Sequence, residues 1–236
     1  MQATPDSDLY IKFLYEVAFK NLSKHIPPDS TRIIELGAGT GTSRKFLPNT
    51  ILTDISHHPS LDITCKSENL PFRSESLDAL ILKDTFHHIP DIETFLLEAT
   101  RVLRENGKIV VFDPYWGFLA RIIYRFLHQE RFDMRAHGWK FESSSPWDSN
   151  QALSYILLRR DRSLFNERFP NLRLEEHGAL IGPSFLLSGG VSRRTIISGR
   201  FLAKLLKLEL RQSQWFRHLS FFHIFSLTKQ NPKART

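Results

Sequence analysis

The feature that most constrains this chain is a glycine loop that follows an apolar run. Residues 33–42 read IIELGAGTGT, so a strand-like run ends at three glycines spaced two apart, Gly37, Gly39 and Gly41. Glycine is needed where the backbone turns with positive φ or lets a ligand approach closely. A strand, a glycine loop and a following helix start together predict a cradle for a nucleotide-type cofactor.

The glycine spacing and two flanking acids indicate which cofactor fits. The dinucleotide fingerprint is GxGxxG, whereas this chain has GxGxG. Glu35 stands two residues before the first glycine, and Asp54 ends the next apolar run, where a carboxylate can accept from both hydroxyls of a ribose. This combination resembles the first motif of class I S-adenosylmethionine (SAM) methyltransferases; a nicotinamide cofactor is the less favoured alternative.

Three further motifs extend the resemblance over residues 30–113. They are similar to segments of small-molecule methyltransferases, of which the ubiquinone/menaquinone-biosynthesis type (methyltransferase type 11) is the best-known example. The motifs are ENLPF with SLDALIL at 68–72 and 76–82, FHHI at 86–89, and RVLRENGKI at 101–109.

The resemblance implies an α/β fold, with a Rossmann-like, doubly wound, seven-stranded sheet. The sheet is mainly parallel, the last strand is antiparallel, and a cap is inserted after the fifth strand. Alternating strands and helices independently predict parallel pairing with right-handed crossovers. The implied cofactor is SAM, and the implied cofactor-binding residues are Glu35, Gly37, Ala38, Gly39, Gly41, Asp54, Ile55, Ser67, Glu68 and Lys83.

Two positions depart from the family's pattern. Asn106 replaces the first glycine of the turn into the fifth strand, and because Asn tolerates left-handed backbone we expect the turn to be kept. Lys66 replaces an Asp that in the family reaches the adenine amine; an ammonium group donates but does not accept hydrogen bonds. A backbone carbonyl or Glu68 would have to make that contact.

We expect one domain of 236 residues. An N-terminal segment, 1–29, carries a helix over 7–25 that is expected to cover the cofactor cleft, since leading helices in the family often do so. The SAM-binding core follows at 30–113. Within the core we expect strands at 31–36, 50–54, 61–65, 77–83 and 108–113 and helices at 41–47 and 91–104.

The second half is less regular. Residues 114–146 are rich in aromatic residues and Arg and have no clean period, which predicts an insertion on the substrate side. The C-terminal half of the sheet, 147–229, is expected to hold a helix over 149–169, a strand over 172–181, a loop over 182–200, a basic amphipathic segment over 200–211 and a last strand over 221–229. We expect a disordered tail at 230–236.

Charge is divided unevenly between the halves. Residues 1–113 hold 12 Lys/Arg and 16 Asp/Glu, net −4, whereas residues 114–236 hold 20 and 9, net +11. Basic surfaces attract phosphate groups, including those of anionic membranes. The single cysteine, Cys65, allows no intramolecular disulfide. With no signal-peptide pattern and no apolar run of about 18 residues, we expect a cytoplasmic protein, with peripheral membrane contact through 200–211 as the less favoured alternative to simple core packing.

Two residues are candidates for catalysis. Methyl transfer to a hydroxyl or an acidic carbon requires a base, and histidine suits that task because its pKa is about 6.5. His87 follows the fourth predicted strand and Asp113 ends the fifth, so both can face the cleft; the alternatives are a structural histidine and a turn-forming aspartate. We expect no metal ion, because the adjacent His87 and His88 do not easily chelate one ion.

Aromatic residues of the insertion are candidates for acceptor binding. Tyr115, Trp116, His137 and Trp139, with Trp147, are expected either to line an acceptor pocket or to anchor the insertion to the domain. Arginines at 121, 125, 131 and 135 either bind a phosphate of the acceptor or form a solvated surface.

The sequence therefore predicts a SAM-dependent methyltransferase that acts on an oxygen or carbon of a small-molecule or lipid- or sugar-linked acceptor. A nucleic-acid methyltransferase is less favoured, because KDTF at 83–86 stands where the Asn/Asp-Pro-Pro-Tyr/Phe motif of amine methylation would follow the fourth strand. A SAM-binding protein without catalysis is the third alternative, and Lys66 is the hint for it.

Overall fold

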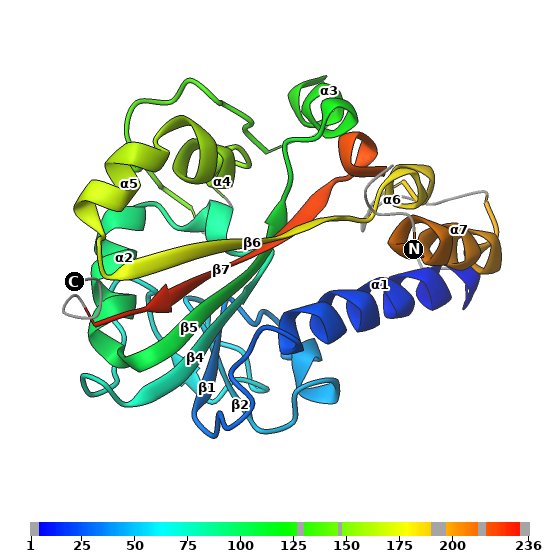
Figure 1. Cartoon of the computed structure of the whole chain (residues 1–236). Helices are drawn as coiled ribbons and strands as arrows, with labels where there is room; N and C mark the ends of the chain where they lie inside the picture. Colours follow the sequence, from blue (N-terminus) through cyan, green and yellow to red (C-terminus); the bar gives the residue numbers. More distant parts are fainter. Residues whose placement is uncertain (1–4, 127–129, 146–147, 190–196, 212–215, 232–236) are drawn as a thin grey trace.

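A computed structural model describes residues 5–126, 130–145, 148–189, 197–211 and 216–231 (Figure 1). Its centre is a seven-stranded sheet with the order β3-β2-β1-β4-β5-β7-β6. The first five strands pair in parallel, and β7 runs antiparallel to both β5 and β6, as predicted. The strands are β1 Ile33–Leu36, β2 Thr50–Asp54, β3 Ile63–Thr64, β4 Leu77–Lys83, β5 Leu103–Pro114, β6 Leu172–Leu180 and β7 Phe222–Lys229.

Helices cover both faces of the sheet (Figure 1). Strand β4 is apolar over most of its length because neighbouring side chains point to opposite faces and both faces are buried. Leu80 and Leu82 belong to one core and Ile81 to the other. One face carries α1 Pro5–Ser23, α6 Pro183–Leu187 and α7 Gly199–Arg211, and the other carries α2 Ile92–Val102, α4 Leu153–Tyr155 and α5 Arg162–Arg168.

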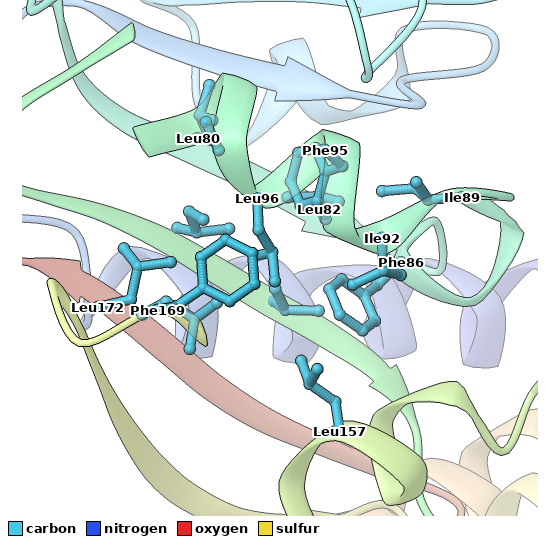
Figure 2. Packing of buried hydrophobic residues seen from close by; sticks show 14 of the residues in the cluster. Leu80, Leu82, Phe86, Ile89, Ile92, Phe95, Leu96, Leu157, Phe169 and Leu172 are labelled. Atoms are coloured by element: carbon cyan, nitrogen blue, oxygen red, sulfur yellow. The ribbon is translucent and has the colours of Figure 1, made fainter. Parts of the chain in front are cut away.

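The core beneath α2 fixes the segment that follows β4. Figure 2 shows Phe86 and Phe95 beside Leu82, with Leu157 approaching from the second half of the chain. Phe86 packs edge-on against both Phe95 and Phe225, and it is fully buried. The short turn η2 Phe86–His88 is therefore held by its aromatic residue, which sets the positions of the two histidines after it.

Several predicted elements of the first half differ from the structure, including the fifth strand, which spans Leu103–Pro114 instead of 108–113. The helix at 41–47 is only a 3-10 turn, η1 Thr42–Lys45, and the strand at 61–65 is reduced to Ile63–Thr64. Leu52 N donates to the Asp62 carboxylate, which also pairs with Arg44. In a regular strand pair the acceptor of Leu52 N would be a backbone oxygen. The first helix spans Pro5–Ser23 instead of 7–25, and α2 begins at Ile92 and ends at Val102, where β5 begins.

The predicted left-handed turn is confirmed, but it lies inside β5, where the residues between Leu103 and Lys108 interrupt the register with β4. Asn106 has a φ of 62°, which is the left-handed conformation that the replaced glycine would supply. Gly107 follows, and a Cβ there would lie 2.8 Å from Arg104 O. The family's turn is kept with a different residue at its left-handed position.

The predicted helix over 149–169 is wrong as a single element. It is divided into α4, a π-helical turn η3 Ile156–Arg160 and α5. Residues 149–151 use their side chains to bind the insertion, and the Asp161 carboxylate accepts from Trp139 Nε1 and Arg160. These long-range hydrogen bonds override the helical period that the sequence shows.

Two helices lie where none was expected. Residues 118–126 of the insertion form α3, and residues 183–187 of the predicted loop form α6. In α3 the buried side carries Ala120 and Tyr124, whereas three large apolar residues point outward. The sequence therefore lacks the single apolar, core-facing stripe by which a helix is usually recognised. Residues 190–196 of the predicted loop lie outside the described residues.

Helix α7 follows the prediction of core packing. Leu202 and Leu206 are buried in the core shared with α1, and Phe201 and Leu208 remain exposed. At the chain end, Gln230 N donates to Asn171 O at 2.8 Å, so the predicted disordered tail does not include this residue; residues 232–236 lie outside the described part. Among the helices of the described residues, none combines the length and the apolar character needed to cross a bilayer.

Candidate active site

The glycine loop has the backbone that the motif predicts. Gly37, Gly39 and Gly41 have φ values of 70°, 55° and 75°. A Cβ on Gly37 would collide with the side chain of Thr85, which closes the loop from the β4 side. A Cβ on Gly39 would meet no atom within 4 Å. The loop is therefore packed on one side and open at its tip.

The carboxylate of Asp54 lies beside that tip. Asp54 Oδ2 accepts from Gly39 N at 2.8 Å, and Oδ1 accepts from Ser56 N at 2.9 Å. The neighbouring Ile55 is 48% exposed, which is unusual for isoleucine. A carboxylate and an exposed apolar side chain thus lie next to the open space above the loop.

Glu35 is buried beneath the loop. It is 3% exposed, and its Oε2 has no hydrogen-bond partner among the described residues. Burial raises the pKa of Glu35 to about 7, although Ser43 and the charge of Lys83 oppose the rise. A buried carboxylate oxygen without a donor is costly, and a cationic or donating ligand group would satisfy it.

Lys83 closes the site towards α1. Its ammonium donates to Asp84 at 2.6 Å and lies 4.3 Å from the centroid of the Tyr15 ring. Burial by itself lowers the pKa of Lys83, but Asp84 and Tyr15 outweigh it and raise the pKa. Because Tyr15 comes from α1, the leading helix borders the ends of β1 and β4.

The predicted adenine-side residues lie in the turn after β3. Lys66 forms an isolated antiparallel bridge with Asn69 and is exposed. Ser67 Oγ donates to Glu68 Oε2 at 2.9 Å. This turn lies beside β2, because Cys65 N donates to Asp54 O at 2.9 Å. Glu68 is thus on the same sheet edge as Asp54.

These residues fit SAM. The open space at Gly39, the carboxylate of Asp54 and the unsatisfied oxygen of Glu35 lie at the carboxyl ends of β1 and β2, where parallel α/β sheets bind ligands. The cofactor offers matching groups, namely a ribose diol, an adenine ring and an amine.

A second cluster lies at the ends of β4 and β5. His87 Nδ1 lies 2.8 Å from Asp113 Oδ1, and His87 Nε2 lies 3.3 Å from Glu130 Oε2. His88 Nε2 lies 4.0 Å from the same Glu130 oxygen. The side chain of Asp113 is completely buried, whereas those of His88 and Glu130 are 21% and 29% exposed. The cluster therefore opens to solvent on the His88 and Glu130 side.

The two carboxylates control the charge of His87. Burial by itself lowers the pKa of His87, but Asp113 and Glu130 outweigh it and raise the pKa to about 10. Burial tends to raise the pKa of Glu130, but hydrogen bonds from His87 and Gln151 lower it to about 2. Burial raises the pKa of Asp113, against the effect of His87. Both carboxylates thus favour the protonated form of His87.

The residues around Glu130 come from the second half of the chain. Ser149 Oγ and Gln151 Nε2 donate to Glu130 Oε2 at 3.2 and 2.8 Å. Asn150 N donates to His87 O, and Asn150 Oδ1 accepts from Asp133 N. The insertion, the segment 149–151 and the turn after β4 are therefore held as one unit.

The predicted acceptor aromatics do not meet in one pocket. Tyr115 is buried, accepts from Arg217 Nε at 3.1 Å and lines a cavity of about 440 Å³ with His223. Trp116 packs against His223 and Tyr155. Both residues therefore anchor the start of the insertion to β7.

His137 and Trp139 lie elsewhere, along a second cavity of about 620 Å³. Trp139 is 4% exposed, stacks near Phe169 and donates Nε1 to Asp161, so it is a core residue and no acceptor contact is expected from it. His137 is exposed. Trp147 lies outside the described residues.

Sequence reasoning missed three residues of the site. Glu130 stands in the aperiodic insertion, Tyr15 stands on a helix interpreted only as a cover, and Asp84 adopts a φ of 52° directly after β4. Of the three, only Asp84 could have been recognised from the sequence, because it is an acidic residue directly after the predicted fourth strand.

Comparisons with known proteins agree with this geometry. Residues 34–111 match the family model described as a methyltransferase domain. A demethylmenaquinone methyltransferase of Tropheryma whipplei (strain Twist) is 24% identical over 184 residues, which cover 66% of this chain and 77% of that protein. A phthiotriol/phenolphthiotriol dimycocerosates methyltransferase 1 of Mycobacterium ulcerans (strain Agy99) is 27% identical over 113 residues. These residues cover 40% of this chain and 42% of that protein.

The fold is also found in solved structures. A SAM-dependent methyltransferase of Thermotoga maritima, described as a possible histamine N-methyltransferase, matches with a TM-score of 0.56 and 19% identity and covers 94% of this chain and 93% of that one. At this identity the likeness concerns the fold. Together with the family match over residues 34–111 and the strand-end geometry, it supports a SAM-dependent methyltransferase of class I, with SAM as its cofactor.

Proposed function

We propose that this methyltransferase modifies an oxygen or carbon of a small, lipid-linked acceptor whose polar end lies at the His87 cluster. The observation that carries the proposal is the two-sided character of α3. Its inner side packs into the core beside β7, and its outer side is an exposed apolar stripe.

On the inner side of α3, Tyr124 is 4% exposed and donates its hydroxyl to Phe221 O at 2.7 Å. Burial raises the pKa of Tyr124, and the charges of Asp113 and Glu130 raise it further, so this side chain is within electrostatic reach of the cluster. A substitution of Tyr124 is therefore expected to alter the electrostatics at the ends of β4 and β5.

On the outer side, Phe118, Ile122 and Phe126 are 60%, 41% and 71% exposed. Their spacing of four residues places them on one face of the helix. Arg121 and Arg125 are exposed beside them. Such a stripe flanked by basic residues suits a lipid chain with a phosphate group, or the surface of an anionic membrane.

Two relatives support a lipid acceptor. Their names specify demethylmenaquinone and phthiotriol or phenolphthiotriol dimycocerosates. The basic second half of this chain, net +11, favours an acceptor that bears phosphate.

For the cofactor, we assign the residues at the ends of β1 and β2. Asp54 accepts from the ribose hydroxyls, Ile55 packs on the adenine, and the backbone of Gly37, Ala38, Gly39 and Gly41 allows close approach. Glu35 receives the amine, with Lys83 nearby, and Ser67 and Glu68 border the adenine. When bound, SAM supplies a methyl group on a positively charged sulfur.

For the acceptor, we assign the exposed side of the cluster. His88 and Glu130 face solvent and are placed to touch its polar group, and His87 orients Glu130 through Nε2. Because Asp113 is fully buried and bonded to His87, we assign it a positioning role in place of the role of base predicted as an alternative. His87 can accept the acceptor's proton at Nε2 only after the hydrogen bond to Glu130 is broken.

The test compares a lipid-linked acceptor with its water-soluble headgroup. The purified chain and labelled SAM are offered polyprenyl-phosphate sugars, prenylated phenols and the matching short-chain compounds. For an acceptor that is methylated, the triple variant Phe118→Ser, Ile122→Ser, Phe126→Ser should raise KM at least about tenfold for the long-chain form, because it removes the apolar surface that binds the chain. KM for the short-chain form should change less than about twofold.

The matched control is Phe201→Ser with Leu208→Ser, which removes exposed apolar surface from α7 instead. It should leave both KM values unchanged. Equal KM effects of the α3 variant on long and short acceptors, or an equal effect of the α7 control, would contradict a lipid-binding role of α3. S-adenosylhomocysteine affinity, measured in the same variants, shows that the cofactor side is intact.

A further inference from the structure

The His87 cluster has a feature that methyl transfer does not require. One nitrogen of His87, one nitrogen of His88 and one oxygen of Glu130 all lie within 4.8 Å of one another. The cluster lies at the solvent-open end of β4, and the burial of its members decreases from His87 to Glu130.

Each imidazole is held by its other nitrogen. His87 Nδ1 is bonded to Asp113 at 2.8 Å, and His88 Nδ1 lies 3.3 Å from the backbone oxygen of Asp148. A histidine that binds a metal ion nearly always donates its second ring N–H to a carboxylate or a backbone carbonyl. Both histidines have this arrangement, and both direct Nε2 towards Glu130.

The third member is oriented in the same way. Ser149 and Gln151 donate to Glu130 Oε2, and the pair comes from a segment far from either histidine in sequence. Hydrogen bonds to a ligating carboxylate are part of the usual surroundings of metal sites. Three candidate ligands therefore each have a fixed orientation.

The donor set is one that proteins use for metal ions. Two imidazoles and one carboxylate, with a position left for water, form catalytic zinc sites, and the same set forms non-haem iron sites. Ligands about 2.0–2.1 Å from one ion at the tetrahedral angle lie about 3.3 Å apart. The separation between His87 Nε2 and Glu130 Oε2 is 3.3 Å, and that between His88 Nε2 and the same oxygen is 4.0 Å.

We propose that His87, His88 and Glu130 bind one divalent transition-metal ion of the zinc class. The open position faces the solvent-exposed side of the cluster, where it can bind water or an oxygen of the acceptor. The expectation of no metal considered only the adjacent histidines, and the proposed third ligand comes from the insertion. The inference concerns metal binding alone and does not depend on the proposed acceptor.

The test uses the full chain without a polyhistidine tag. The protein is stripped with a chelator, and zinc is titrated against a chromophoric competitor, with Mn²⁺ and Mg²⁺ in parallel. We expect one equivalent of zinc, an increase of the melting temperature and far weaker Mg²⁺ binding. Glu130→Gln and His88→Asn should each weaken zinc binding by more than about 100-fold, because loss of a ligand should exceed the roughly 10–100-fold cost of losing an outer partner.

Matched controls are Glu142→Gln and His57→Ala, which remove an exposed acid and an exposed histidine outside the cluster. Neither should change zinc affinity. X-ray absorption of the wild-type zinc complex should show two imidazoles and oxygen ligands at about 2.0–2.2 Å, and this measurement needs no variant to fold. The proposal is overturned by no zinc uptake at tenfold excess, or by equal affinity in Glu130→Gln, His88→Asn and wild type.

Discussion

The proposed cofactor side and the proposed acceptor side of this enzyme are assembled in different ways. The cofactor side draws on residues 35–55, which lie on two adjacent parallel strands and the loop between them. The acceptor side joins His87 and Asp113 to Glu130 and to residues 149–151. The first is built from neighbouring strand ends, and the second requires an insertion to fold back.

The two sides also differ in how their charges are neutralised. Glu35 has one buried oxygen, Oε2, without a hydrogen-bond partner among the described residues, as is expected where a ligand will supply one. On the acceptor side, His87 stands between two carboxylates and is an ion-pair partner to both, although Asp113 Oδ2 also has no hydrogen-bond partner among the described residues. Substitutions on the cofactor side should therefore weaken cofactor binding but leave the stability of the fold intact. Substitutions on the acceptor side should lower the stability but leave cofactor binding intact. Three variants test this difference.

The largest effect is expected from Gly39→Val. The open space at the loop tip would be filled, and φ at 55° would be strained, so we expect S-adenosylhomocysteine binding by calorimetry to be lost. Gly138→Val is the matched control, since it has a φ of 67° and equally open surroundings but lies in the insertion. If Gly138→Val also abolished S-adenosylhomocysteine binding, the cofactor side would not be independent of the insertion.

The next effect is expected from Asp113→Ala. Removal of one member of a buried ion pair should lower the free energy of unfolding by about 3 to 5 kcal/mol, measured by urea denaturation. S-adenosylhomocysteine affinity should stay within about twofold of wild type. Glu93→Ala, which breaks an exposed pair with Arg168, should cost less than about 1 kcal/mol. A large loss of cofactor affinity in Asp113→Ala would show that the two sides are coupled.

A smaller, pH-dependent effect is expected at Glu35. The folded state holds its proton up to about pH 7, above the ordinary value of 4.5, so the stability that this proton contributes is complete below pH 4.5 and is lost as pH rises through 7. Glu35→Gln should therefore stabilise the cofactor-free protein by up to about 3 kcal/mol at pH 8 and by little at pH 4.5.

Thermal unfolding across pH 4.5–8, with Glu16→Gln as an exposed control, checks this expectation. Glu35→Gln should also weaken S-adenosylhomocysteine binding at pH 8, where the carboxylate is charged. A variant that is no more stable than wild type at pH 8 would mean that Glu35 already has a partner without the cofactor.

Sequence patterns were reliable where local chemistry decided the structure. The glycine loop, the strand ends at Glu35 and Asp54 and the left-handed turn at Asn106 each depend on a few adjacent residues. Sequence patterns failed where contacts between residues distant in the sequence competed with the helical period. The helix expected over 149–169 is divided because its residues bind Glu130 and Trp139 instead.

The sequence by itself therefore determined the α/β class, the seven-stranded and mainly parallel sheet with its antiparallel last strand and, through the family resemblance, the cofactor class. The alternation of strands and helices indicates parallel pairing, and the glycine loop with its flanking acids carries the resemblance that implies SAM and the seven-stranded sheet. Only the tertiary structure decided that Asp113 is fully buried against His87, that Trp139 belongs to the core, and that Glu130 completes the cluster. The physical reason is that an aperiodic insertion has no local preference strong enough to fix its position, so its contacts are set by the charges and cavities it meets on the folded sheet.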